Sequence, residues 1–162
     1  MTDVAVPEEQ LESEGAPAPT RRLLVFEVGG GTFATEMSAV REIVPSQPVT
    51  RLPGAPLAVS GLINLRGTII TVVDAGSCLG KSPWRRIGGL VLLGVYQDGV
   101  IGIGIDDVRD IHDVTEDKFG GAPTGTPDGA VVSGVVEIDG EQVPLLDIPV
   151  MIRDVLGQQE AG

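Results

Sequence analysis

The sequence has few aromatic residues, one cysteine and one histidine, and each shortage excludes a class of protein. Three Phe, one Trp and one Tyr are all the aromatics in 162 residues, so the core has to be built from Val, Ile and Leu. The lone Cys78 excludes an internal disulfide and fits a reducing compartment. The lone His112 has no second imidazole or thiol cluster with which to form a metal site, so we interpret it as a solvated loop residue.

Positive charge and long apolar runs are also scarce. Eleven Lys and Arg face 23 Asp and Glu, which leaves a net charge of −12. This deficit argues against nucleic acid, because phosphate neutralisation needs clustered cations, and against anionic membrane surfaces. No apolar run reaches the roughly 18 residues of a membrane span, and the N-terminus is acidic where a signal peptide is basic. We therefore expect a cytoplasmic protein that does not insert into a membrane.

What the sequence does contain is organised around one stretch, residues 59–74. Two apolar runs, 62–65 and 69–73, are rich in β-branched residues and are too short for independent helices. Arg66, Gly67 and Thr68 separate them, and a short connection that contains Gly is typical of a β-hairpin. The stretch therefore predicts a hairpin with Arg66 at its tip.

This hairpin occurs twice. Residues 132–147 repeat the pattern of residues 59–74 at a displacement of 73, and residues 108–111 repeat residues 40–43 at a displacement of 68. Both blocks recur in the same order, which chance similarity between β-rich segments does not explain well, so we infer a duplicated β-unit. Twenty-three Gly and 12 Pro provide the turns that an all-β chain needs. We expect an all-β fold with two related subdomains.

The rest of the chain divides as follows. We predict a disordered acidic tail, which could also bind a partner, then one domain of two intertwined subdomains, then a disordered C-terminal tail. These parts are residues 1–21, 22–157 (approximately 22–89 and 90–157) and 158–162. Short helical turns are expected at residues 40–42 and 107–110, a mobile loop at 120–129, and a C-terminal helix over 149–156 that ends at Gly157.

The sharpest catalytic candidate is residues 75–82, which match a relaxed phosphate-loop pattern after a strand. Pro83 leaves no room for the helix that should follow, and no parallel α/β pattern surrounds the segment. A small nucleotide-binding hydrolase is therefore only an alternative. Asp74 and Asp147 end matching strands, where capping is a better interpretation than an acid pair. We predict no enzyme, no cofactor and no metal.

Several stretches together resemble the CheW family of chemotaxis adaptors. They are residues 33–37, 40–43, 50–56 and, most specifically, the Gly-Leu-Ile-Asn-Leu-Arg-Gly run of 61–67 with the strand 69–74 after it. The resemblance covers about residues 22–156, although Thr71 stands where Pro is usual and residues 75–77 replace a charged turn. It implies two pseudo-symmetric five-stranded SH3-like β-barrels with short helical turns and a C-terminal helix.

The resemblance also implies partners and sites. Members join chemoreceptors to the histidine kinase CheA, so this chain would be recruited to receptor arrays at the inner face of the membrane. Val40 and Glu42 fall on receptor-facing positions and Arg66 on the hairpin-tip arginine. The kinase contact would fall within residues 62–73. The residues with an implied kinase-binding or hairpin-shaping role are Gly61, Leu65, Gly67 and Ile69.

Plainer interpretations of these residues stay open. Val40 could be core, Glu42 an ordinary surface charge, and Arg66 a brace within its own domain, which is compatible with a functional role. A generic SH3-like peptide binder is a further alternative, but such grooves are lined with aromatic residues. Trp84 and Tyr96 are nearly all that this chain offers for one.

Overall fold

The computed structural model describes residues 19–84, 87–125 and 130–161. Most of the predicted acidic tail, residues 1–18, lies outside this description, as do residues 126–129 of the predicted loop. The first strand begins at Thr20, so the ordered domain starts slightly earlier than predicted. No helix within the described ranges is both long enough and apolar enough to cross a bilayer.

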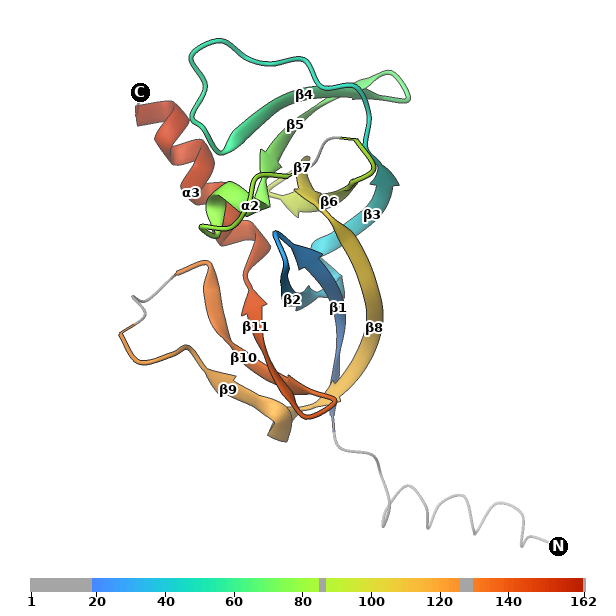
Figure 1. Cartoon of the computed structure of the whole chain (residues 1–162), viewed down its shortest axis with the longest axis vertical. Coiled ribbons are helices and arrows are strands. Elements are labelled where there is room, and N and C mark those ends of the chain that lie inside the picture. The colour runs from blue at the N-terminus through green and yellow to red at the C-terminus, as the bar shows by residue number, and fades with distance from the viewer. Residues whose placement is uncertain (1–18, 85–86, 126–129, 162) are drawn as a thin grey trace, which may run out of the picture.

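The described chain is built mostly from strands, with two single-turn 3-10 helices, a four-residue helix and one longer C-terminal helix (Figure 1). The strands are β1 (Thr20–Val28), β2 (Gly31–Glu36), β3 (Val40–Pro45), β4 (Val59–Leu65), β5 (Thr68–Asp74), β6 (Leu90–Tyr96), β7 (Gly99–Ile105), β8 (Asp107–Thr115), β9 (Phe119–Gly121), β10 (Val132–Ile138) and β11 (Glu141–Leu146). The helices are η2 (Met37–Ala39), α2 (Ala75–Cys78), η3 (Glu116–Lys118) and α3 (Ile148–Ala161).

The strands form two sheets. Sheet A has the order β8-β1-β2-β11-β10-β9 and forms the lower half of the molecule in Figure 1, and sheet B has the order β3-β6-β7-β5-β4 and forms the upper half. The all-β, two-unit prediction is therefore confirmed. Sheet A carries one strand more than the predicted five, because β9 pairs with β10 through its three residues.

Each sheet takes a hairpin from the other half of the chain. The β1–β2 hairpin lies between β8 and β11, and the β6–β7 hairpin lies between β3 and β5. Each insertion ends in a parallel pairing, Ala34 with Leu145 in sheet A and Gly102 with Val72 in sheet B. Ala34 and Gly102 are related by the displacement of 68 found in the sequence, and Val72 and Leu145 by the displacement of 73. The duplication is therefore visible in the strand register. Subdomains divided near residue 89 do not correspond to the two sheets.

The helical turns predicted at residues 40–42 and 107–110 are wrong, because both segments are strands. Arg41 in β3 and Arg109 in β8 each form a bulge, at equivalent points of the pairings with β6 and β1. The helical turn lies three residues earlier, at η2, and Ser38 does not cap it. Pairing with a neighbouring strand determines the backbone conformation of these two segments, and local capping propensity does not.

The C-terminal helix α3 fills the space between the sheets. Its residues Ile148, Met151 and Ile152 are at most 1% exposed and pack in one cluster with Phe26 of β1 and Leu92 of β6. The helix was predicted to end at Gly157 but continues through Ala161. The residues that follow Gly157 are two Gln, a Glu and an Ala, which are good helix formers and carry the helix past the glycine.

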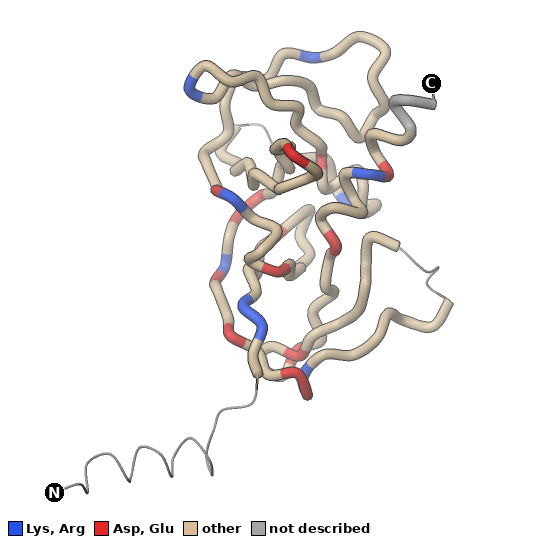
Figure 2. The backbone as a smooth tube through the Cα atoms, turned by 180° about the vertical axis from the view of Figure 1, so that it is seen from behind, with Lys and Arg blue, Asp and Glu red and all other residues tan. Residues whose placement is uncertain are grey.

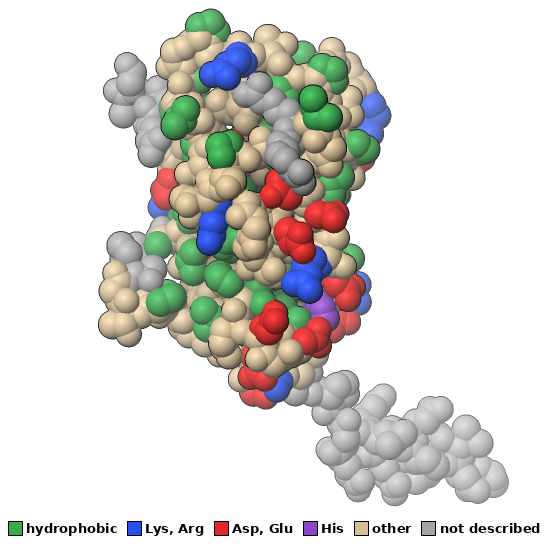
Figure 3. Space-filling model, viewed as in Figure 1, with side chains coloured by type: hydrophobic (Ala, Val, Ile, Leu, Met, Phe, Trp, Pro, Cys, Tyr) green, Lys and Arg blue, Asp and Glu red, His purple; other side chains and the backbone are tan. Residues whose placement is uncertain are grey.

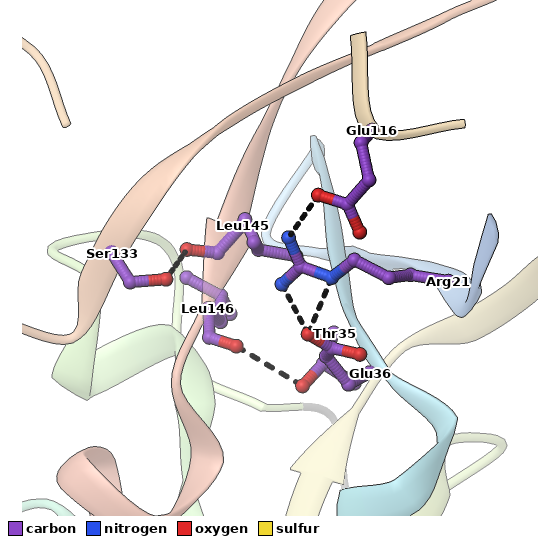
Figure 4. A network of polar contacts seen from close by, with 7 residues as sticks. All are labelled: Arg21, Thr35, Glu36, Glu116, Ser133, Leu145 and Leu146. Carbon is purple, nitrogen blue, oxygen red and sulfur yellow. Dashed lines mark hydrogen bonds and ion pairs between the residues drawn. The ribbon is translucent and has the colours of Figure 1, made fainter. Parts of the chain in front are cut away.

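A polar network joins β1 to the far end of sheet A (Figure 4). Arg21 donates from Nε to Glu36 of β2 at 2.8 Å, and its guanidinium also reaches Glu116 of η3 at 4.0 Å. The same guanidinium lies over the ring of Phe119 in β9, 4.0 Å from its centroid. Arg21 therefore connects the first strand to the segment that leads into β9 and helps to curl the sheet.

Candidate functional site

The β4–β5 hairpin ends in a tight two-residue turn. Leu65 pairs with Thr68, and the two residues between them, Arg66 and Gly67, have φ angles of 52° and 87°. Two left-handed residues in succession match the right-handed twist of a hairpin. The side-chain oxygen of Asn64 accepts a hydrogen bond from the Gly67 amide at 2.9 Å. Asn64 lies in the most specific run of the family resemblance but was assigned no role from the sequence, although Asn at the start of a turn is a known turn signal.

Arg66 and Glu42 meet across sheet B. Arg66 Nη2 donates to Glu42 Oε1 at 2.7 Å, with side chains 65% and 38% exposed. Glu42 lies on β3 and Arg66 follows β4, which are the two outer strands of the sheet. The bracing interpretation of Arg66 is therefore observed in the geometry. Because both side chains are exposed, both charges are accessible to a partner. An exposed pair of this kind also adds little stability.

Val40 stands at the start of β3, on the same strand as Glu42. It is partly buried and packs against the cluster that contains Leu92 and Ile148. Its backbone pairs with Gly94 of β6, whereas Glu42 pairs with Leu93. Because neighbouring residues of a strand face opposite sides of a sheet, Val40 and Glu42 point to opposite faces of β3.

The four residues expected to bind the kinase or shape the hairpin divide into two groups. Gly61 has a φ of 143°, and a Cβ there would lie 2.2 Å from the carbonyl oxygen of Thr50. Together with Gly67 it shapes the hairpin. Leu65 is partly buried against the core of sheet B. Ile69 is 59% exposed, so it is the large apolar side chain that this hairpin presents to the solvent.

The relaxed phosphate-loop match does not form a phosphate cradle. Its helix α2 has only four residues, and its amides already have acceptors within the chain. Ser77 donates to the side chain of Asp74 at 3.2 Å, and Lys81 donates to the carbonyl of Gly76 at 2.8 Å. A bound phosphate would need such amides to be free, so the geometry does not favour the nucleotide-binding alternative.

The capping interpretation of the two repeated aspartates is confirmed. Asp74 accepts from the Ser77 amide, and Asp147 accepts from the Val150 amide at 3.1 Å, at equivalent positions of the two repeats. Asp74 also accepts from the backbone amide of Trp84 at 3.0 Å, and the indole of Trp84 donates to the carbonyl of Ile105. Trp84 is only 6% exposed, so it is not available to line a peptide groove.

The structure agrees with the predicted packing role of Cys78 but not with the predicted loop position of His112. Burial, helped by the nearby carboxylates of Asp74 and Asp154, raises the pKa of the Cys78 thiol to about 11, which suits a small packing residue. The loop placement of His112 is wrong. It lies on strand β8, its side chain is 26% exposed, and its Nε2 lies 3.5 Å from Asp110 Oδ2.

Comparison with known proteins adds to this geometry. The model of the family described as "CheW-like domain" matches residues 22–156. The chain is 32% identical to the chemotaxis protein CheW of Rhizobium meliloti (strain 1021) over 131 residues, which are 79% of this chain and 84% of that protein. It is 27% identical to the probable chemotaxis protein CheW of Rhizobium etli over 137 residues, which are 83% and 88% of the two chains.

One solved structure shows the same fold. The scaffolding protein TtCheW from Thermoanaerobacter tengcongensis superposes with a TM-score of 0.73 at 22% identity, over 82% of this chain and 92% of that one. At this identity the likeness establishes the fold. The prediction of two SH3-like barrels followed by a C-terminal helix is confirmed.

Proposed function

Because this chain belongs to the CheW-like domain family, we propose that it is a non-enzymatic scaffold that couples chemoreceptors to a CheA-type histidine kinase. Such a scaffold works through its surfaces, so the residues that matter are those that stay accessible while the fold holds them in place. The hairpin tip of sheet B and the adjacent edge of β3 have this character.

The observation that carries the proposal is the exposed Arg66–Glu42 pair, whose carboxylate lies on the same edge strand as Val40. The pair offers both charges at the surface, and Val40 is a partly buried apolar residue of that strand. A helical receptor tip could contact Val40 and exchange one partner of the ion pair for its own charged group. Contacts between rigid signalling domains commonly combine an apolar centre with charges that set the register.

The kinase contact is proposed for the other side of the same hairpin. Ile69 is exposed on β5, and the turn formed by Arg66 and Gly67 fixes its position. An SH3-like regulatory domain would bury Ile69 at a barrel-to-barrel contact, with Leu65 supporting it from the core side. Gly61 and Gly67 act by shaping the hairpin, and no contact with the kinase is needed from them.

Co-sedimentation tests this function directly. Receptor cytoplasmic fragments, a CheA-type kinase and this chain are mixed, and both the pelleted complex and kinase autophosphorylation are measured. The proposal predicts a ternary complex and a more active kinase. If the chain binds neither receptor nor kinase, the proposal is wrong. In a cell, the protein should accumulate with the receptors at the inner face of the membrane.

A further inference from the structure

The two repeats differ at the place where sheet B carries its surface ion pair. Glu42 follows the bulge at Arg41 in β3, and Asp110 follows the equivalent bulge at Arg109 in β8. Arg66 is the first residue of its turn with a φ of 52°, and Asp139 is the first residue of the matching turn with the same φ. Sheet A therefore keeps the carboxylate and replaces the arginine with a second acid.

The two acids line one hollow. Asp110 and Asp139 lie on the rim of a cavity of about 250 Å³ at the end of sheet A. Val25, Ile138 and Val143 also line it, and these side chains are at most 8% exposed. The cavity is smaller than the roughly 300–1,000 Å³ of pockets for drug-sized ligands, which suits a single long side chain. Most of the accessible lining is polar, so a side chain that enters would be bound chiefly through its charged end.

The remaining charges leave this rim acidic. Glu141 is the third acid, and His112 lies 3.5 Å from Asp110. Arg109 is the one cation in the lining, and it is engaged with Glu27 at 3.7 Å and with the hydroxyl of Thr32 at 3.2 Å. Among the described residues, neither Asp139 nor Glu141 forms a side-chain ion pair.

The surroundings reinforce this charge. In Figure 3, acidic side chains gather around the single histidine of the chain, over the sheet A half of the molecule. Figure 2 shows the same half from behind, with most of the acidic positions along it. A cationic group would be attracted to this end of the molecule before it made any specific contact.

We propose that the hollow between Asp110 and Asp139 receives an arginine side chain from a partner protein. The occupant is identified by the other repeat, where the equivalent carboxylate binds the guanidinium of Arg66 at 2.7 Å. Sheet B supplies this cation from its own hairpin, and sheet A leaves the place to a second protein. A planar guanidinium pairs with carboxylates better than an ammonium does. The proposal does not depend on the partners proposed above.

The test is an NMR titration of the full ¹⁵N-labelled chain with a blocked pentapeptide that carries one central arginine. Two matched peptides carry lysine or the uncharged isostere citrulline at the same position. We expect saturable shifts at the amides of residues 110–112 and 139–141 with the arginine peptide. Equal binding of the lysine or citrulline peptide would overturn the assignment, as would shifts spread over the whole acidic face.

Variants of the chain complete the test. D139R places a guanidinium where Arg66 stands in the other repeat, and arginine already tolerates the same backbone angle there. We expect D139R to weaken binding of the arginine peptide by at least about tenfold, because the hollow then holds its own cation. D98N removes one acid from the β6–β7 turn and should change binding by less than about twofold. Amide spectra verify that both variants fold, and unchanged binding in D139R contradicts the proposal.

Discussion

The guanidinium of Arg66 lies 2.7 Å from the carboxylate of Glu42, although 24 residues separate them in the chain. The contact joins the two outer strands of sheet B, β3 and β4, which do not pair with each other in the sheet order. A side-chain contact therefore links the two edges of the sheet. Because the pair is at the surface, exchanging one of its members for a partner's group costs little.

Replacing Arg66 or Glu42 with alanine should weaken kinase activation and leave the fold nearly unchanged. An exposed ion pair contributes about 0–1 kcal/mol, so the free energy of unfolding should change by no more than that. Activation is measured by autophosphorylation in receptor complexes, and unfolding by urea denaturation. Arg22→Ala is the matched control, because Arg22 is equally exposed and pairs with Asp113 in sheet A. A loss of stability that accounts for the lost activation would make the pair purely structural.

The two glycines of the hairpin should respond differently to alanine. At Gly67 a Cβ meets nothing within 4 Å, so Gly67→Ala should cost only about 1 kcal/mol, for the positive φ. At Gly61 the Cβ would lie 2.2 Å from the Thr50 carbonyl oxygen, and that backbone has to move. Gly61→Ala should therefore cost about 3 kcal/mol or more. Thermal denaturation of both variants measures the difference, and equal costs would contradict the observed contact.

Ile69→Asp should abolish binding to the kinase while binding to receptor persists. The side chain is 59% exposed, so a charge is tolerated in the free protein but would be buried unpaired in a complex. Calorimetric titration with the regulatory domain of the kinase gives the affinity. Ile111→Asp is the control, because Ile111 is 50% exposed on the other sheet. Comparable losses of affinity in both variants would show that the contact is elsewhere.

Trp84 should be a structural residue and a reporter of folding. It is the one tryptophan of the chain and is 6% exposed, so its emission should be blue-shifted and should move to the red on unfolding. Trp84→Ala should destabilise the fold by about 3–5 kcal/mol through the cavity it leaves. Trp84→Phe, which fills much of the cavity but lacks the donor to Ile105, should cost less. An emission maximum typical of exposed indole in the native state would contradict this burial.

The Cys78 thiol should react slowly with alkylating agents at neutral pH. Its pKa is raised from 9.0 to about 11, mainly by burial, so the thiolate that reacts is rare at pH 7. Between pH 9 and 11 the unfolded chain loses this proton while the folded chain keeps it, so stability should fall as the pH rises through this range. Alkylation rates by mass spectrometry from pH 7 to 11 test both points. An inflection at or below pH 9 would refute the shift.

The sequence was sufficient to predict the repeated hairpins, but not that the β1–β2 and β6–β7 hairpins are exchanged between the two sheets. Alternating apolar residues and turn glycines determine β4–β5 and β10–β11 locally, so both could be predicted from the pattern. Which strands flank the β1–β2 hairpin depends on contacts between Leu145 and Ala34, more than 100 residues apart. Nothing local in either segment specifies this partner.

The candidate site was predicted in part for the same reason. The hairpin glycines and the tip arginine follow from turn chemistry near one point of the chain. Val40 and Glu42 were placed on a helical turn, because capping residues are a local signal and the pairing with β6 is not. The turn-forming role of Asn64 was not predicted, although its hydrogen bond to Gly67 is local. The hollow beside Asp139 was missed because its lining residues come together only in three dimensions.

The exchanged hairpins also set the order in which the protein can be completed during synthesis. When residues up to Asp74 have left the ribosomal exit tunnel, β1 and β2 have emerged, but β8 and β11, their neighbours in the finished sheet, have not. Sheet A can close only after Leu146 leaves the tunnel. The early hairpin must therefore wait with both edges unpaired, which makes this interval the time when a nascent chain most needs a chaperone.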